Sequence, residues 1–307
     1  MNARRSPFPH FRAGVYRLLA IAAVAVALAL PLRQALAAVP LALEVYTADT
    51  TAGIGVTSTL IYGDHEAILV DTQFRISDAE KLADLVAAKG RHLKAILITH
   101  PHYDHFFGAA VLLQRFPGTP VYATASEIDF IHRTLADRLA LVRKEFGPDN
   151  IPAEVPIPQV FPSTYFTVDG QAVEILTDLQ GDVGPAPGNN IVWVPSLEAA
   201  IAGDIVFNQR HLSMGATNPA SRQAWIETLR LIQRLNPRIL VAGHKNSPEL
   251  ADNQEPLAFG IRYITDFEAA VSGSHSAADL VAAMKQKYPQ IGGERTLQFG
   301  ARALFPQ

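Results

Sequence analysis

The sequence predicts an α/β fold in which two packed β-sheets carry helices on their outer faces, and three observations lead to it. Strand-like segments occur in two groups, at about 43–71 and 165–202, and helical patterns follow each group. A helical pattern separates two apolar runs at 67–71 and 94–99, which is typical of a βαβ unit. Of the 307 residues, 49% are apolar and 18% are charged, which is enough to bury a full core. Grouped strands favour a layered sandwich over a doubly wound sheet.

The first group predicts a hairpin followed by the βαβ unit. Gly63-Asp64 fits the hairpin turn, and Ser77 with Glu80 fits a capping box at the start of a helix. The run at 94–99 is almost continuously apolar, as expected for a buried strand. Strands are predicted at 43–47, 56–62, 67–71 and 94–99, and helices at about 77–89, 107–115 and 125–146.

The second group predicts another hairpin, two further strands and a helical C-terminal part. Asp169-Gly170 fits the hairpin turn, and Asn189-Asn190 are interpreted as turn formers before a strand. Two loops, the proline-rich 147–163 and the glycine-rich 181–190, flank the hairpin. Strands are predicted at 165–176 (the hairpin), 191–194, 199–202 and 238–242, and helices at 220–235 and over most of 250–307.

The first 37 residues have the pattern of a secretory signal. Four arginines precede an apolar run at 18–32, and Ala35-x-Ala37 fits a cleavage site. The run is shorter than the roughly 20 residues of a membrane span, although an uncleaved anchor is the alternative, and Arg4-Arg5 also fits twin-arginine export. We therefore expect a periplasmic or secreted protein, with a signal at 1–37, one folded domain at 38–307 and no stable membrane insertion after cleavage.

Charge and cysteine content exclude several classes of function. The net charge is −3, and cleavage would remove five basic and no acidic residues, leaving 21 basic against 29 acidic ones and a net charge of −8. An acidic chain without a basic aromatic patch is not expected to bind nucleic acid. The absence of Cys excludes disulfides, thiol nucleophiles and thiolate metal sites. A transition-metal site would therefore use His and carboxylate ligands, and the partner is expected to be a small-molecule substrate.

One short segment contains four potential metal ligands. Residues 99–105 read Thr-His-Pro-His-Tyr-Asp-His, directly after the buried strand at 94–99. In an extended segment His100 and His102 point the same way, whereas Asp104 and His105 turn into the next helix. One segment could therefore serve two adjacent metals. The alternative is a solvated polar loop. Packing four such groups together without a metal would cost free energy through charge repulsion and desolvation.

This segment resembles the His-x-His-x-Asp-His signature of the metallo-β-lactamase superfamily. In the same order, Asp204 in Ala202-Gly203-Asp204 and His244 in Val241-Ala242-Gly243-His244 match a metal-bridging Asp and a last His ligand, and Asp71 matches an early structural Asp. The resemblance covers about 43–250. It implies a four-layer αββα sandwich, with the site at one edge and a helical C-terminal extension at about 250–307.

The chain departs from the family pattern at the third His ligand. No His occurs between 133 and 210, and Asp182 in Gly181-Asp182-Val183 is the best-placed replacement, with Asp178 less favoured. A carboxylate oxygen is an acceptable zinc ligand and shifts a site toward manganese or iron. The alternative is that Asp182 is a turn residue and water fills the position.

The resemblance implies two Zn²⁺ ions, with Fe or Mn possible in their place. Asp204 would bridge the ions, a hydroxide shared between them would be the nucleophile, and Asp104 would orient it and carry a proton. The first site would use His100, His102 and Asp182, and the second Asp104, His105 and His244.

The remaining polar candidates are given weaker roles. His211 could line the pocket, and Tyr103 could reach the substrate or pack in the core. His132 is interpreted as a helix surface or packing residue. Solvated turns are expected for His65, His92 and His275.

Three functions are compatible with these residues. The first is an exported binuclear zinc hydrolase that cleaves a lactone, a β-lactam or a thioester. The second is a mononuclear iron oxidoreductase of the persulfide-dioxygenase type. The third is a binding protein with a degenerate metal site, which the missing third His prompts.

Overall fold

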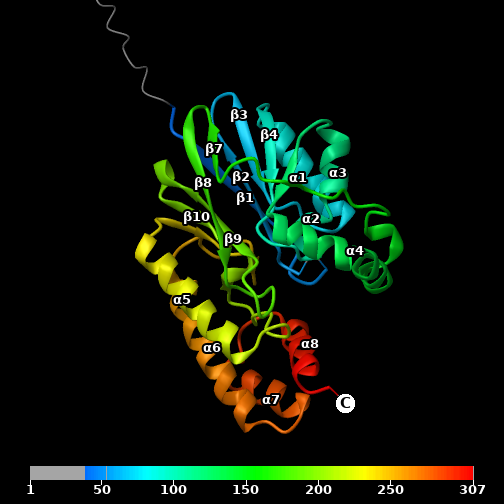
Figure 1. Cartoon of the computed structure of the whole chain (residues 1–307), viewed down its shortest axis with the longest axis vertical. Coiled ribbons are helices and arrows are strands. Elements are labelled where there is room, and N and C mark those ends of the chain that lie inside the picture. The colour runs from blue at the N-terminus through cyan, green and yellow to red at the C-terminus, as the bar shows by residue number, and fades with distance from the viewer. Residues whose placement is uncertain (1–38, 53, 307) are drawn as a thin grey trace, which may run out of the picture. The chain divides into compact units, whose positions relative to one another are not determined.

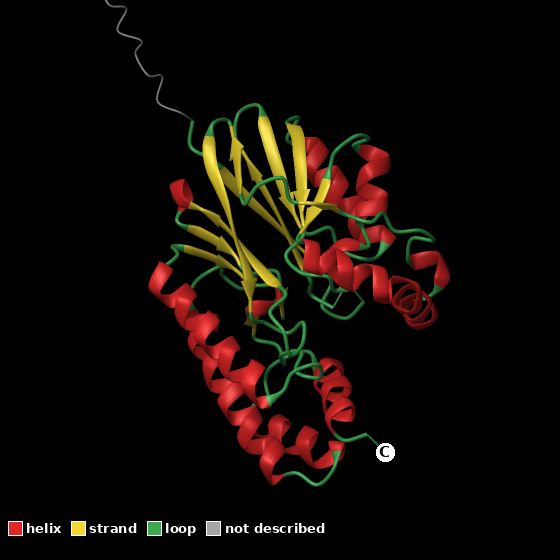
Figure 2. Cartoon of the chain, viewed as in Figure 1, coloured by secondary structure: helices red, strands yellow, loops and turns green. Residues whose placement is uncertain are grey.

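Two β-sheets lie face to face, and helices cover the outer face of each (Figures 1 and 2). The computed structural model describes residues 39–52 and 54–306. The predicted signal at 1–37 lies outside these residues. The four-layer αββα arrangement is confirmed, with helices α1, α3 and α4 on one side and α5 and α6 on the other.

The first sheet contains six strands in the order β1-β2-β3-β4-β5-β6. The first three pair antiparallel, and β3 to β6 pair parallel. Helix α1 connects β3 to the parallel strand β4, which is the predicted βαβ unit. The elements are β1 (Ala42–Thr47), β2 (Thr57–Tyr62), β3 (Glu66–Val70), α1 (Ile76–Ala88), β4 (His92–Leu97), α2 (Tyr103–Phe106), α3 (Ala109–Arg115), β5 (Val121–Ala123), α4 (Ala125–Phe146) and β6 (Gln159–Val160).

The second sheet contains five strands in the order β12-β10-β9-β8-β7. The predicted hairpin through Asp169-Gly170 joins β7 to β8, and β10 pairs parallel with β12. A small third sheet pairs β11 with β13. The elements are β7 (Tyr165–Val168), β8 (Gln171–Leu179), β9 (Asn189–Val194), β10 (Ala199–Ile201), β11 (Phe207–Asn208), α5 (Pro219–Leu235), β12 (Ile239–Val241) and β13 (His244–Lys245).

Three apolar clusters hold the layers together. The inner cluster lies between the sheets and includes Ile68 and Leu97 from one and Val173 and Val192 from the other. Each outer cluster joins one sheet to its helices, and Trp225 of α5 is fully buried in one of them. Full burial of a large apolar side chain contributes about 1.5–3 kcal/mol. Alternate side chains of the strands point to opposite faces of each sheet and therefore pack into the inner cluster on one face and an outer cluster on the other.

The C-terminal part is helical, as predicted. It consists of α6 (Glu255–Gly273), α7 (Ala277–Lys287) and α8 (Glu294–Leu304), and α6 packs along α5 (Figure 1). Among the described residues, no helix has the length and apolar character needed to cross a membrane.

Two local predictions are wrong. Helix α1 begins at Ile76 with Arg75 as its N-cap, and Ala79 N already donates to Arg75 O at 2.9 Å. Ser77 therefore lies inside the first turn and cannot cap it. Asn189 and Asn190 are the first residues of β9 rather than turn formers, because their side chains bond to buried carboxylates.

Candidate metal centre

All seven sequence-predicted ligands gather at one edge of the two sheets. The loop after β4 provides His100 and His102, and the short helix α2 provides Asp104 and His105. The loop between β8 and β9 provides Asp182. Asp204 follows β10 and His244 follows β12, and because these strands run parallel their carboxyl ends meet at the same edge.

The first ligand group contains His100, His102 and Asp182. One Asp182 oxygen, Oδ2, lies 3.1 Å from His102 Nδ1, and the other lies 3.9 Å from His100 Nε2. His100 and Asp182 are buried, and His102 is partly open. Together with Asp204, these side chains offer ligand atoms that all lie within 4.8 Å of one another. The structure thus brings Asp182 to the two histidines, whereas Asp178 is exposed and outside the group.

The second group contains Asp104, His105 and His244, and Asp204 contacts both groups. Asp104 Oδ2 lies 3.2 Å from His244 Nε2. Asp204 Oδ1 lies 3.2 Å from His105 Nε2, while its Oδ2 lies 3.3 Å from His244 Nε2 and 3.7 Å from His100 Nε2. This is the position that a carboxylate bridging two metals would occupy.

The unpaired atoms of the site fit bound metal ions. Within the described part of the chain, four buried ligand atoms have no hydrogen-bond partner: His100 Nε2, His105 Nε2, Asp182 Oδ2 and Asp204 Oδ1. Leaving a buried polar atom unpaired costs about 1–3 kcal/mol, and more when the group is charged. Imidazole nitrogens and carboxylate oxygens are ligands of zinc and of other divalent transition metals. These residues therefore could hold two metal ions.

Outer contacts orient three of the imidazoles with Nε2 toward the centre. His105 Nδ1 lies 2.7 Å from Asp71 Oδ2, His100 Nδ1 lies 3.0 Å from Thr99 Oγ1, and His244 Nδ1 lies 3.0 Å from a backbone carbonyl, Ile54 O. When Nδ1 carries the proton and donates, the Nε2 lone pair is free to bind a metal. Asp71 therefore acts through His105 rather than as a ligand.

Charge–charge contacts dominate the protonation of the centre. Burial lowers the pKa of His244, but Asp204 and Asp104 outweigh it and raise that pKa to about 9. Burial raises the pKa of Asp104, but His105 and His244 hold it below its usual range. Without metal, His105 and His244 therefore keep their protons, which metal ions must displace, whereas burial lowers the pKa of His100. Metal affinity should consequently fall with falling pH.

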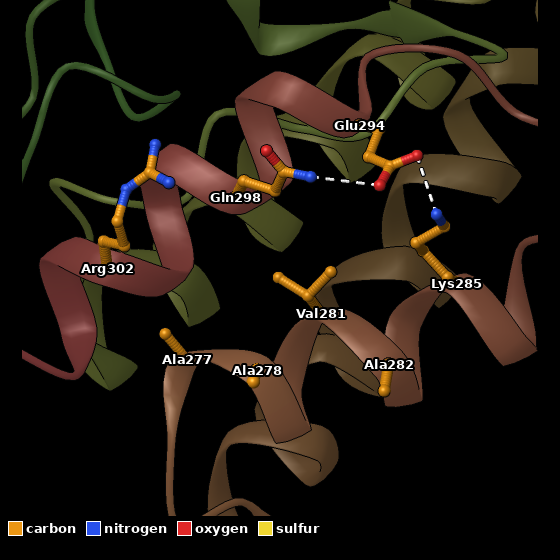
Figure 3. Close-up of a pocket in the computed structure, with 8 residues that line it drawn as sticks. All are labelled: Ala277, Ala278, Val281, Ala282, Lys285, Glu294, Gln298 and Arg302. Carbon is orange, nitrogen blue, oxygen red and sulfur yellow. Dashed lines mark hydrogen bonds and ion pairs between the residues drawn. The ribbon is translucent and has the colours of Figure 1, made fainter.

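The centre opens into a cavity of about 620 Å³. His102, Asp104, Asp182, Asp204 and His244 line its floor, and the walls come from α4, α8 and the loop after β11. Figure 3 shows a neighbouring hollow between α7 and α8, where Glu294 bonds to Lys285 and Gln298, and it shares Glu294 and Arg302 with the cavity lining. That hollow shares no residue with the metal centre, so the cavity at the ligands is the candidate substrate site.

Comparison with known proteins decides the family. Residues 52–244 match the family model described as the metallo-beta-lactamase superfamily. The chain belongs to the metallo-beta-lactamase superfamily. The resemblance drawn from the ligand motif is thereby confirmed, and the matched range contains all seven ligands of the centre.

Sequence relatives of this superfamily member are named hydroxyacylglutathione hydrolases. One, of Blochmanniella pennsylvanica, is 35% identical over 95 residues, covering 30% of this chain and 36% of that protein. Another, hydroxyacylglutathione hydrolase GloC of Haemophilus influenzae, is 25% identical over 195 residues, covering 61% and 84%. The chain spans about a third of the length of the first of these.

Solved structures of the superfamily share the fold. A metallo-beta-lactamase family protein of Thermus thermophilus aligns with a TM-score of 0.59 at 20% identity, over 86% of this chain and 91% of that one. The B3 metallo-beta-lactamase BLEG-1 aligns with a TM-score of 0.53 at 20% identity, over 70% and 96%.

In this superfamily member a hydrogen bond from Asn189 holds the Asp182 carboxylate in place. Asn189 Nδ2 donates to Asp182 Oδ1 at 3.2 Å, which leaves Oδ2 toward His102. A Cβ on Gly181 would lie 2.6 Å from the Asn189 amide carbon, so only glycine leaves room for this contact. Sequence reasoning missed Asn189, and its only signal was its place at the end of the loop that carries Asp182.

Substituting Asn189 by Ala should weaken metal binding in the first group. Loss of an outer-shell hydrogen bond to a ligand typically lowers metal affinity about 10- to 100-fold, and one of two metal ions should be affected. Competition with a chromophoric chelator measures this loss. Asn190→Ala is the matched control, because that amide bonds to Glu127 instead and should leave both affinities near wild type. Equal losses in the two variants would contradict a specific role for Asn189.

Of two other side chains in this part of the fold, Tyr103 fits its predicted roles and His211 does not. Tyr103 lines the cavity, where it could reach a substrate, and it also packs edge-on against Phe74. His211 does not line the cavity. It is buried, and its Nδ1 lies 2.9 Å from Tyr263 Oη. Arg210 takes that place in the wall, and sequence reasoning missed it.

The other histidines of the described residues lie on the surface. His65 and His92 are exposed in or beside turns of the first sheet, and His275 is exposed before α7, as predicted. His132 is exposed on α4, which matches its interpretation as a helix surface residue.

The buried imidazole of His211 should lower the free energy of unfolding in mild acid. Burial lowers its pKa to about 4, whereas an unfolded His titrates near 6.5. The unfolded state therefore takes up a proton first, and stability is lost as the pH falls from about 6.5 toward 4. Between pH 7.5 and pH 5, metal-free wild type should lose about 2 kcal/mol more than metal-free His211→Gln. Urea unfolding at the two pH values measures this, and equal losses would contradict it.

Proposed function

We propose that this chain is an exported metal-dependent hydrolase that uses two zinc ions to cleave a carbonyl substrate, with thioesters the foremost class. One observation carries the proposal. Two ligand groups share the carboxylate of Asp204 and open together into one cavity. That arrangement fits a paired metal centre with direct access for a small molecule.

The reaction requires an activated water and a proton donor. Bound metal ions would lower the pKa of a water and polarise the substrate carbonyl. Asp104 lines the cavity, so its carboxylate is placed to take a proton from the attacking water and return it to the leaving group. Water oxygen bonds to the carbonyl carbon, the carbon–sulfur bond breaks, and the proton goes to sulfur. An acid and a thiol leave.

The relatives support a thioester as the substrate. They are named hydroxyacylglutathione hydrolases, and a hydroxyacylglutathione is a thioester. Lactones and β-lactams present a similarly electrophilic carbonyl and belong to the same proposal. Arg210 supports an anionic substrate group, because its buried guanidinium lines the cavity.

The ligand set also favours a second candidate, a mononuclear iron oxidoreductase. His100, His102 and Asp182 make up two imidazoles and one carboxylate, which is the set that holds non-haem Fe(II) in oxygenases. The third hypothesis, a binding protein with a degenerate site, was prompted by the missing third His, and the carboxylate of Asp182 beside His102 argues against it.

Elemental analysis and a substrate panel test the proposal. We expect about two zinc ions per chain and hydrolysis of acyl thioesters, lactones or β-lactams by the zinc-loaded protein. One iron per chain without hydrolysis would support the second candidate instead. Export is proposed from the pattern at 1–37 alone. Mass spectrometry of the full chain expressed in a Gram-negative host should find a periplasmic or secreted product that begins at Ala38.

A further inference from the structure

Two helices give the cavity an apolar wall beyond the metal ligands, flanked by charged residues of the same helices such as Arg138 and Arg302. Leu141, Val142 and Phe146 of α4 line it on one side, and Phe299 of α8 lines it on the other. Helix α8 lies outside the range 52–244 that matches the superfamily model. The part of the wall that α8 provides therefore lies outside the region that matches the family model.

The outermost apolar residues of this wall are open to water. Leu141 is 47% exposed and Phe299 is 60% exposed. Six large apolar side chains are exposed among the described residues, and two of them line this one cavity. Scattered single exposures need no explanation, but a pair in the wall of a cavity with metal ligands on its floor marks a binding surface for an apolar group.

Contacts between α4 and α8 hold the two sides of the wall together. Arg295 of α8 forms an ion pair with Glu145 of α4, and its guanidinium lies 5.5 Å from the centre of the Phe146 ring. On the other side of α8, a Cβ on Gly215 would lie only 3.0 Å from Gly300 Cα, so the helix backbone lies against the loop after β11. The apolar pair is thus presented by two helices in fixed contact.

We propose that the natural substrate carries an apolar acyl chain or ring that packs between Leu141 and Phe299 while its scissile carbonyl lies at the metal ligands. This inference rests on the proposed hydrolase function and narrows its substrate class. A small polar acyl group would leave both side chains in water. A cavity of about 620 Å³ has room for an apolar group beside the reacting carbonyl.

Binding of uncleavable substrate mimics to the metal-free full chain tests this without any catalysis. N-acylethanolamides with acetyl, butanoyl, hexanoyl and octanoyl chains keep the carbonyl but resist hydrolysis. Their affinities, measured by isothermal titration calorimetry, should rise about threefold for each methylene that becomes buried. Affinities that do not change with chain length would overturn the inference.

Substitutions locate the surface that makes this contact. Leu141→Ser and Phe299→Ser should each weaken binding of the octanoyl amide about tenfold and leave the acetyl amide unchanged, and Leu141→Phe should retain the octanoyl affinity. Val160→Ser is the matched control, because Val160 is 56% exposed on β6 and does not line the cavity. Equal losses in the control would overturn the assignment to this wall.

Two further measurements distinguish the apolar wall from a dimer contact and from a failure of the hydrolase itself. Sedimentation equilibrium of the same variants would show whether Leu141 and Phe299 instead hold a second copy of the chain. A change in association state without a change in chain-length dependence would overturn the proposal. Failure of the zinc-loaded wild type to cleave any acyl thioester, lactone or β-lactam would overturn the proposed function, whereas the chain-length series bears on the apolar wall alone.

Discussion

Replacing Asp204 with Ala should abolish hydrolysis by the zinc-loaded chain, with a loss of at least about a thousandfold in kcat/KM. Among the described carboxylates, Asp204 is the one that lies within 3.7 Å of an imidazole nitrogen of both ligand groups. Its removal would take a ligand from each of the two proposed metal ions and would leave His100, His105 and His244 without the carboxylate between them. Several kcal/mol of transition-state stabilisation depend on intact metal sites, which corresponds to this loss in rate.

Metal content separates loss of the centre from loss of the fold. The Asp204→Ala protein should retain fewer than two metal ions per chain after dialysis against a weak chelator, while its far-ultraviolet circular dichroism stays that of the wild type. Asp149→Ala serves as the control. Asp149 is exposed and distant in sequence from every ligand, so its substitution should change neither the metal content nor the circular dichroism. A variant with two bound metals and wild-type turnover would contradict the bridging role.

Much of the fold could be predicted because its strands have strong local patterns. The run at 94–99 is almost continuously apolar, and β4 is buried over most of its length with inner and outer cores on its two faces. The hairpin through Asp169-Gly170 was predictable because Asp169 and Gly170 have positive φ, which Asp tolerates and Gly adopts freely. Both patterns can be recognised from a few residues that are adjacent in the sequence.

The supporting residues of the site could not be predicted, because distant contacts decide their roles. The sequence around Asn189 is that of a turn, and only the packing of β9 beside the metal loops brings its amide to Asp182. Arg210 has no local pattern that distinguishes a cavity wall from a surface. The start of α1 was misplaced because Ser77 and Glu80 satisfy the capping rule locally, while the backbone after Asp71 already turns into the helix at Ile76.

The ligands and the walls of this site therefore follow from different parts of the chain. The motif residues lie on short connections at the ends of buried strands, where the sheets fix them in place. The apolar wall depends on α4 and on α8, whose sequences show only helical periodicity. A superfamily match consequently bears on the candidate metal ligands, which lie within the matched range, while the acyl-group preference has to be measured on this chain.

Two substitutions of Asp71 should have different effects: Asp71→Ala should mainly lower the free energy of unfolding, and Asp71→Asn should mainly weaken metal binding. Its carboxylate accepts hydrogen bonds from Thr99 N and Thr99 Oγ1, both at 2.8 Å, and from His105 Nδ1 at 2.7 Å. All three donors are buried, and Asp71→Ala would leave them unpaired. At about 1–3 kcal/mol for each unpaired group, the metal-free variant should lose about 4 kcal/mol or more in the free energy of unfolding, measured with urea. Asp71 also has φ 60°, so Asp178→Ala, at φ 57° but exposed, controls for the backbone.

The conservative variant Asp71→Asn should keep more stability and yet weaken metal binding. Asn tolerates positive φ and still accepts one hydrogen bond. Its amide donors would face His105 Nδ1, which favours the tautomer with the proton on Nε2, the atom that points toward Asp204. We expect a 10- to 100-fold loss of metal affinity in chelator competition, with a smaller loss of stability than in Asp71→Ala. If Asp71→Asn bound metal as tightly as the wild type, His105 would not depend on Asp71 for its tautomer, and the orientation argument would be wrong.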